Sequence, residues 1–284
     1  MNSENAATEL SQTPERSAGN AQSAVHGVGA ALDAAAASDD WGNAPDEQHP
    51  YPVVLVHGTL GSRETTWPQM TLKLKAAGYR VFSLNYGAMP TLPMLRGLYG
   101  LGDIKKSSQE LADFVDRVLA DTGAQQVDIV GHSQGGMTPH YYLKFLGGTG
   151  KVRRLVGIAP SCHGVTVDGL LALVRQLPAV REVVEAEVLF RVSPAFTQLL
   201  HDSDFVDELV APGDTVNGVD YTVIWSTYDE VVKPPESQQL TPTHPDDQVT
   251  NLRLQTLDPK RRTRHLSMPS DSVVLRETLK ALAD

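Results

Sequence analysis

Strand-like and helix-like segments alternate along most of this chain, and that alternation restricts its fold more than any other sequence feature. The β-rich runs, several too continuously apolar for a half-exposed strand, are YPVVLVHG, YRVFSLNYG, QQVDIVGHS, RRLVGIAPS and VDYTVIWSTYD (51–58, 79–87, 125–133, 153–161 and 219–229). Helical patterns lie between most of them, at 67–78, 107–123 and 135–148. Repeated strand–helix units predict an α/β fold with a mostly parallel central sheet and helices on both faces.

The alternation pauses between residues 161 and 218. Apolar residues there fall at helical spacing in two stripes: Val167, Leu170, Leu171, Val174 and Leu177, followed by Val180, Val183, Val184 and Val188. This pattern predicts a cap-like helical excursion over the carboxyl edge of the sheet. Packing against the core is its simpler interpretation, and lining a pocket for an acyl chain is its functional one. The chain then ends with a predicted strand at 248–257 and a helix at 269–284.

The first 48 residues differ from the rest. They are rich in Ala, Ser, Asn and Gln and poor in large apolar side chains, which predicts a mostly disordered tail. The remaining residues, 49–284, have the length of one large domain that would include the 161–218 excursion.

Charge and cysteine content exclude several classes of function. The net charge is −10 with 24 Lys and Arg against 34 Asp and Glu, which argues against a nucleic acid or an anionic membrane as partner. The basic stretch PKRRTR at 259–264 fits a solvated loop. No apolar run is long enough for a transmembrane helix. The start of the sequence has no secretory pattern and Cys162 is the only cysteine, so a cytoplasmic location is favoured over secretion.

A serine lies at one of the predicted strand-to-helix junctions. Ser133 stands in GHSQG between Gly131 and Gly135, after the apolar run VDIV. This G-x-S-x-G pattern is typical of a nucleophile elbow, in which the serine has strained dihedral angles and the glycines allow close backbone packing. The pentapeptide alone is a weak signal, so the interpretation depends on the residues at the ends of the other strands.

A serine hydroxyl becomes a nucleophile when a histidine, itself oriented by a carboxylate, takes its proton. In a parallel sheet these groups belong at the carboxyl ends of the strands, in the order Ser, acid, His. Asp229 follows the run at 219–229 and His265 follows the last strand, so they are the predicted acid and base. Glu230 is the alternative acid, and His244, in a proline-rich loop ahead of the last strand, is the alternative base.

Acyl transfer also needs amide donors that stabilise an oxyanion. The amide of Gln134 at the start of the helix is one candidate, and that of Thr59 in HGTLG is the other. His57 and His132 are flanked by turn glycines, and we assign them a structural role. No metal site is predicted, because the chain has no H-E-x-x-H motif and a single cysteine cannot build a zinc knuckle.

Taken together, these residues resemble those of an α/β-hydrolase of the actinobacterial class 2 lipase type, from about residue 52 to about 270. The most specific segments are VLVHGT, LNYG, GLGDI, GHSQGGMTPHYYLKFLGG, GIAPSCHG, TYDEVV and RHLSMP. The resemblance implies a carboxylic-ester hydrolase with Ser133, Asp229 and His265 as the triad, Thr59 and Gln134 as the oxyanion hole, and no cofactor. It also implies acyl binding across an apolar top face near Leu60 and Met137, a face that could contact a lipid interface.

The chain departs from this family pattern at its cysteines. Secreted relatives tend to have a cysteine pair around the segment matching residues 193–198 and another cysteine near 254–259, where this chain has Ser193, Phe196 and Asp258. Cys162 replaces the usual asparagine. The missing disulfides put a secreted location in doubt and do not touch the catalytic set.

The sequence therefore predicts a serine hydrolase that cleaves acyl esters through an acyl-enzyme on Ser133. An acyltransferase with the same triad is the alternative enzyme. A binding module on a hydrolase scaffold is the alternative from another class, since a fold alone does not establish chemistry.

Overall fold

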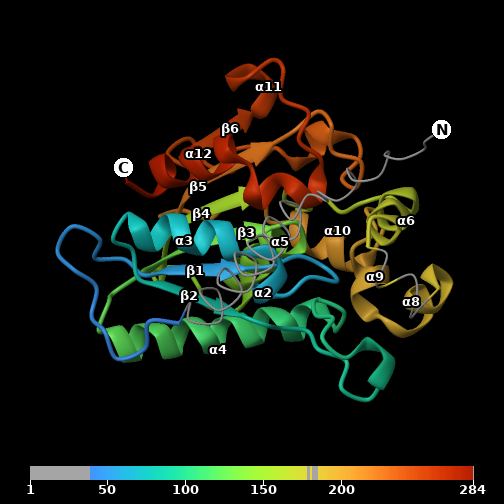
Figure 1. The fold of residues 1–284 in the computed structure, drawn as a ribbon, viewed down its shortest axis with the longest axis horizontal. Coiled ribbons are helices and arrows are strands. Elements are labelled where there is room, and N and C mark those ends of the chain that lie inside the picture. Colours follow the sequence, from blue (N-terminus) through green and yellow to red (C-terminus); the bar gives the residue numbers. More distant parts are fainter. Residues whose placement is uncertain (1–38, 178–179, 181–184, 284) are drawn as a thin grey trace, which may run out of the picture.

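A computed structural model describes residues 39–177, 180 and 185–283 of the chain. Its centre is a six-stranded sheet in the order β2-β1-β3-β4-β5-β6, in which every neighbouring pair is parallel (Figure 1). The strands are β1 (Val53–Val56), β2 (Val81–Leu84), β3 (Val127–His132), β4 (Val152–Ile158), β5 (Asp220–Trp225) and β6 (Val249–Arg253). The predicted parallel α/β sheet is confirmed. The last strand is shorter than predicted, because residues 254–257 form the short helix α11 (Leu254–Leu257).

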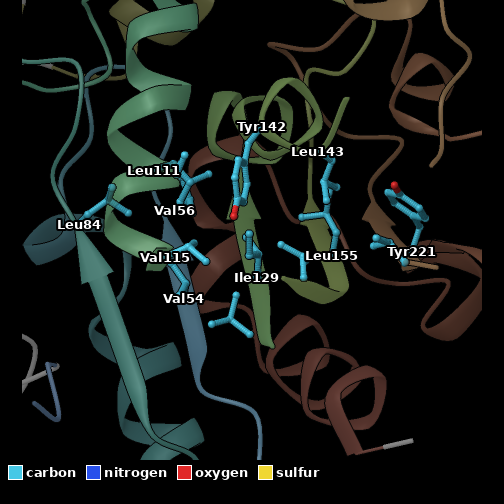
Figure 2. Packing of buried hydrophobic residues seen from close by; sticks show 14 of the residues in the cluster. Val54, Val56, Leu84, Leu111, Val115, Ile129, Tyr142, Leu143, Leu155 and Tyr221 are labelled. Atoms are coloured by element: carbon cyan, nitrogen blue, oxygen red, sulfur yellow. The ribbon is translucent and has the colours of Figure 1, made fainter. Parts of the chain in front are cut away.

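Helices cover both faces of the sheet. On one face lie α4 (Ile104–Thr122) and α5 (Gln134–Phe145), and on the other lie α3 (Pro68–Ala76) and α12 (Ser272–Ala283). Alternate residues of each strand point to opposite faces, so Val54 and Val56 pack under α4 while Val53 and Leu55 pack under α3 and α12. Figure 2 shows the first of these layers, with side chains of α4 and α5 closing over β1 and β3. Burial on both faces explains why the strand runs are so continuously apolar.

Local sequence signals set the ends of the longest helix. Asp103 caps the start of α4 by accepting a hydrogen bond from the amide of Lys106, and Gly123 ends the helix in the left-handed conformation with φ 71°. Both are the residue types that such positions favour. The helix therefore extends three residues further toward the N-terminus than the predicted 107–123.

The 161–218 region forms the predicted helical excursion. It contains α6 (Val167–Arg175), α8 (Ala186–Val192), α9 (Pro194–Gln198) and α10 (Asp204–Val210), which group at one end of the molecule (Figure 1). On α6 the buried apolar residues are Leu170, Leu173 and Val174, whereas Val167 is exposed. The first stripe is therefore rotated slightly from the predicted one. Part of the second, at 183–184, lies outside the described residues.

The described end of the predicted tail, residues 39–48, contacts the domain. The rings of Trp41 and Phe82 lie 4.9 Å apart, centroid to centroid, and Phe114 packs against the same indole. The carboxylates of Asp39 and Asp40 accept hydrogen bonds from the amides of Ser83 and Val81 on the edge strand β2. These acidic side chains satisfy donors that an edge strand would otherwise expose. The rest of the predicted tail, residues 1–38, lies outside the described residues.

Candidate active site

Ser133 occupies a sharp turn between β3 and α5. Its backbone angles are φ 57° and ψ −123°, a conformation that costs energy for any residue with a Cβ. The flanking glycines make the turn possible. A Cβ on Gly131 would lie 1.9 Å from the carbonyl oxygen of Gly135, and a Cβ on Gly135 would lie 2.0 Å from that of Val56. The sequence pattern therefore corresponds to a strained strand–turn–helix that presents the serine side chain at the carboxyl edge of the sheet.

Asp229 and His265 follow β5 and β6 and meet at this same edge. The Nδ1 atom of His265 lies 2.8 Å from Oδ2 of Asp229, and both side chains are fully buried. The other ring nitrogen of His265, Nε2, has no hydrogen-bond partner among the described residues. A histidine held through Nδ1 by a carboxylate, with Nε2 left open, is arranged to act as a base.

The buried Asp229 carboxylate accepts several hydrogen bonds from the protein. Its Oδ1 accepts hydrogen bonds from the amides of Val231 and Val232, at 2.8 and 3.0 Å. Burial by itself raises the pKa of Asp229, but the charge and hydrogen bond of His265, together with these two amides, outweigh it and bring the pKa below its ordinary value. Asp229 is therefore an anion despite its burial.

The alternative acid and base do not reach this arrangement. The Glu230 carboxylate pairs with the guanidinium of Arg264 at 3.1 Å, and its contact with His265 is to the backbone amide, at 3.5 Å, rather than to the ring. His244 is exposed in the loop before β6, where its amide donates to Asp247. The structure therefore pairs the His265 ring with the Asp229 carboxylate. Neither Glu230 nor His244 takes part in this contact.

The two predicted oxyanion donors are coupled to each other through their side chains. The hydroxyl of Thr59 donates to Oε1 of Gln134 at 2.8 Å, which joins the turn after β1 to the elbow. Gln134 is the first residue of α5, where a helix leaves its amide groups without intrahelical partners. In the Thr59 turn, the amides of Leu60 and Gly61 donate to the carbonyls of Tyr99 and Gly58. The Thr59 amide is the remaining candidate beside the serine.

His57 and His132 are buried neutral rings. Burial lowers the pKa of His57 to about 4 and that of His132 to about 3. The Nε2 atom of His132 lies 3.1 Å from the backbone carbonyl of His265. Because a carbonyl only accepts, Nε2 must carry the proton and His132 ties the elbow to the His265 loop. His57 stacks on the ring of Tyr86 with 4.5 Å between centroids. These contacts agree with the predicted structural role.

A cavity of about 320 Å³ opens over Ser133 and His265. One part of its wall is aliphatic and another carries threonine hydroxyls. The aliphatic residues are Leu60, Leu98, Leu173, Leu177, Val180 and Leu266, and the threonines are Thr59, Thr65 and Thr66. Of the two predicted substrate-binding residues, Leu60 therefore lines the cavity. Met137, one helical turn after the serine, is not among the lining residues; it is fully buried in an apolar cluster that also contains Leu60.

Sequence reasoning missed part of this lining, including Leu98, Leu173 and Leu266, and one buried amide. Leu98 lies in a loop and Leu266 in a short 3-10 helix, His265–Ser270, and neither belongs to a periodic apolar pattern, although Leu266 directly follows the predicted base. Gln238, which donates a hydrogen bond to Asp229, lies in a short turn that no motif marks.

Among the described residues no group of three or more His, Cys, Asp or Glu side chains could hold a metal ion. No helix among these residues is long and apolar enough to cross a membrane.

Comparison with known proteins identifies similar chains. The family model described as lipase (class 2) matches residues 50–253. Two triacylglycerol lipases, from Pseudarthrobacter phenanthrenivorans and Burkholderia plantarii, are each 33% identical over 96 residues, which is 32% of this chain. Those residues are 27% and 24% of the two lipases, so the match spans about a quarter of each relative's length.

Solved structures share the fold. Lipase B of Aspergillus fumigatus superimposes with a TM-score of 0.64 and 25% identity, over 82% of this chain and 52% of that chain. The mature lipase BlEst2 of Bacillus licheniformis gives a TM-score of 0.59 at 16% identity, over 84% of this chain and 94% of that one. The second likeness shows the fold alone.

Proposed function

The chain belongs to the class 2 lipase family, and on that premise we propose that it is a serine hydrolase of carboxylic esters. Ser133 is the nucleophile, His265 the general base and Asp229 the residue that orients the base. The proposed hydrolysis extends to this chain what the names of its relatives say of them.

One observation carries the proposal. The buried 2.8 Å hydrogen bond between Asp229 and Nδ1 of His265 leaves Nε2 of that histidine without a partner among the described residues. His265 and Ser133 line the same cavity. A fixed imidazole that has an unpartnered nitrogen and lines the same cavity as a strained serine supports acyl transfer better than it supports a purely structural histidine.

In the first half of the reaction Oγ of Ser133 attacks the ester carbonyl carbon while Nε2 of His265 takes the hydroxyl proton. The carbonyl oxygen becomes an oxyanion, which the amides of Thr59 and Gln134 stabilise; each such donor lowers the barrier by about 3 kcal/mol. The tetrahedral intermediate then collapses, and the leaving alcohol takes the proton from His265. The acyl group remains on Ser133.

In the second half a water molecule gives its proton to Nε2 of His265 and attacks the acyl-enzyme. A second tetrahedral intermediate releases the carboxylic acid and returns the proton to Ser133. Asp229 stays ionised throughout and stabilises the imidazolium that forms in each half. The amides of Val231 and Val232 support this role because they hold the carboxylate as an anion.

The cavity supports a neutral acyl ester as substrate. Apart from the two histidines, its described lining contains no side chain that ionises near neutral pH, and aliphatic residues make up much of the wall. An acyl chain placed against Leu98, Leu173 and Leu177 would gain roughly 0.8 kcal/mol for each methylene removed from water. We therefore propose lipid-like esters with an apolar acyl chain.

Hydrolysis of p-nitrophenyl esters of increasing chain length by the wild type and by Ser133→Ala tests the proposal. The wild type should release p-nitrophenol from part of the series, and Ser133→Ala should fall to the rate of the buffer. Equal rates for the two proteins across the series would refute it. Adding an alcohol and analysing the products distinguishes transfer to water from transfer to another acceptor.

We also propose a cytoplasmic location for this protein. Cys162 is a free and buried thiol whose pKa burial raises to about 12, so it is unreactive toward thiol exchange. Fractionation of cells that express the native gene, with activity measured in each fraction, tests the location.

A further inference from the structure

Gln238 is a buried amide side chain that touches the Asp229 carboxylate. It is the last residue of a 3-10 turn, Pro235–Gln238, between β5 and β6, and its side chain is fully buried. Its Nε2 atom donates to Oδ2 of Asp229 at 3.2 Å. Gln238 does not line the cavity over Ser133, so any effect it has on the reaction must pass through Asp229.

The orientation of the Gln238 side-chain amide leaves its oxygen without a hydrogen bond. Asp229 is ionised and has no proton to donate, so the NH₂ group of Gln238 must face it. The opposite end of the amide, Oε1, is then left buried without a hydrogen-bond partner among the described residues. An unsatisfied buried acceptor is unfavourable and rare in native proteins, which indicates that the contact with Asp229 has a use.

The two oxygens of Asp229 have different donors. Oδ1 accepts hydrogen bonds from the backbone amides of Val231 and Val232. Oδ2 accepts hydrogen bonds from the His265 ring and from the side-chain amide of Gln238. Gln238 therefore supplies the second hydrogen bond on the oxygen that holds the proposed base. Without it, that oxygen would be held by His265 alone, and the carboxylate could tilt whenever the imidazole moves.

The turn that carries Gln238 is itself tied to the cap. The carbonyl of the preceding residue, Ser237, lies 2.6 Å from Nδ1 of His163, and Nε2 of the same ring lies 2.8 Å from Asp214. Asp214 also accepts the amide of Thr241, beyond the turn. These contacts clamp the turn from both sides, so the position of Gln238 is well defined.

We propose that Gln238 is a positioning residue that fixes the Asp229 carboxylate, and through it the His265 ring, in the orientation needed for proton transfer from Ser133. This inference rests on the proposed ester hydrolysis. A misplacement of the base by a fraction of an ångström is expected to lower turnover and to leave substrate binding unchanged.

The test replaces Gln238 with Met, which has a similar length and shape but no donor. With a p-nitrophenyl ester, kcat of Gln238→Met should fall about 10-fold and KM should stay within about twofold of the wild type. Gln239→Met is the matched control: it makes the same change at the next residue, whose partly exposed side chain reaches only the carbonyl of Glu236. It should leave both constants unchanged.

A double-mutant cycle separates positioning from a general structural role. In an Asp229→Ala background Gln238 has no carboxylate to hold, so adding Gln238→Met should lower kcat no further. An equal loss in both backgrounds, or a kcat of Gln238→Met within about twofold of the wild type, would overturn the inference.

Gln238→Glu provides a second readout if the methionine variant folds poorly. A glutamic acid donates a hydrogen bond to Asp229 only while it is protonated, and a neighbouring carboxylate favours that form. The kcat of Gln238→Glu relative to the wild type should therefore fall as the pH rises from about 6 to about 9. A ratio that does not change with pH would count against the positioning role.

Failure of the inference is distinguishable from failure of the proposed function. If the wild type hydrolyses esters and Ser133→Ala does not, the function stands whatever Gln238 does. If the wild type itself is no faster than Ser133→Ala, the proposed function fails before Gln238 is tested.

Discussion

Asp229 and His265 face each other across 2.8 Å, carboxylate to imidazole, in a fully buried contact between loops that follow two different strands. They are 36 residues apart in the chain. They meet because β5 and β6 are adjacent parallel strands whose carboxyl ends lie at the same edge. Because of this contact, the loss of Asp229 should affect His265 more than the loss of the neighbouring Glu230.

We expect Asp229→Asn to keep its fold and to lose about 10⁴-fold in turnover, because asparagine has the same shape but cannot hold the required tautomer of His265 or stabilise its cation. Ester hydrolysis and urea unfolding of the purified variant measure the two properties. Glu230→Gln is the matched control and should retain nearly full activity, since Glu230 pairs with Arg264. Near-normal activity of Asp229→Asn would point to Glu230 as the acid instead.

The strained serine predicts a stability difference between two inactive variants. Ser133→Gly should be more stable than Ser133→Ala by about 1 kcal/mol, because only the alanine keeps a Cβ at φ 57°. This net value allows for the larger entropy that glycine loses on folding. Denaturant unfolding of the two variants measures the difference. If the alanine variant were as stable as the glycine variant or more so, the elbow would not be strained.

The cavity wall predicts a change in substrate preference. Leu173 lies on the cap helix α6 and lines the cavity, so Leu173→Trp should shorten the space for an acyl chain. The kcat/KM for long-chain p-nitrophenyl esters should fall about 10-fold relative to the acetate ester. Leu171→Trp, on the same helix but away from the cavity, should leave the chain-length profile unchanged. An unaltered profile in Leu173→Trp would place the acyl chain elsewhere.

The His163–Asp214 pair predicts a pH-dependent stability. Nδ1 of His163 faces a carbonyl and Nε2 faces a carboxylate, so both nitrogens must donate and the ring must be a cation. The hydrogen bond to Asp214 comes first among the causes that raise the pKa of His163, with burial opposing it. The nearby charge of Lys144 opposes the cation, and buried His140 adds none because burial lowers its pKa to about 3.

A group whose pKa is raised on folding contributes stability that is complete below its unfolded pKa and is lost as the pH rises through its folded pKa. The wild type should therefore be more stable than His163→Gln at about pH 6, by about 1–2 kcal/mol, and should lose that advantage toward about pH 9. Urea unfolding at both values measures it. His244→Gln, at an exposed histidine, should show no such trend, and an advantage that persists at the higher pH would contradict the cationic pair.

The segment ahead of β1 predicts that the domain needs residues before 49. Trp41 packs against Phe82 and Phe114, and the guanidinium of Arg117 lies 4.1 Å from the centre of its ring. Trp41→Ala should lower the free energy of unfolding by about 2–3 kcal/mol through the loss of these contacts. Asn43→Ala, an exposed neighbour, should change it by less than about 0.5 kcal/mol. Equal stability of the two variants would mean that the segment only rests on the surface.

The strands and the main helices could be predicted because their signals are local. Buried parallel strands require continuous apolar runs, and α4 begins and ends at a capping aspartate and a left-handed glycine. The elbow could be predicted because its backbone permits only glycine at 131 and 135. The order of serine, acid and histidine along the strands then named Asp229 and His265. It also left two alternatives open: Glu230, the residue next to Asp229, and His244, in the loop ahead of the last strand.

What the sequence determined by itself is the alternation of buried strands and amphipathic helices, and the strand ends at which the polar residues stand. Tertiary structure alone decided which carboxylate reaches the imidazole, that Leu60 rather than Met137 lines the cavity, and that Gln238 touches Asp229. The reason is physical. Apolar periodicity and glycine constraints act over a few neighbouring residues, whereas a side-chain contact depends on where separate loops bring their atoms, and that position is set by the packing of the whole domain.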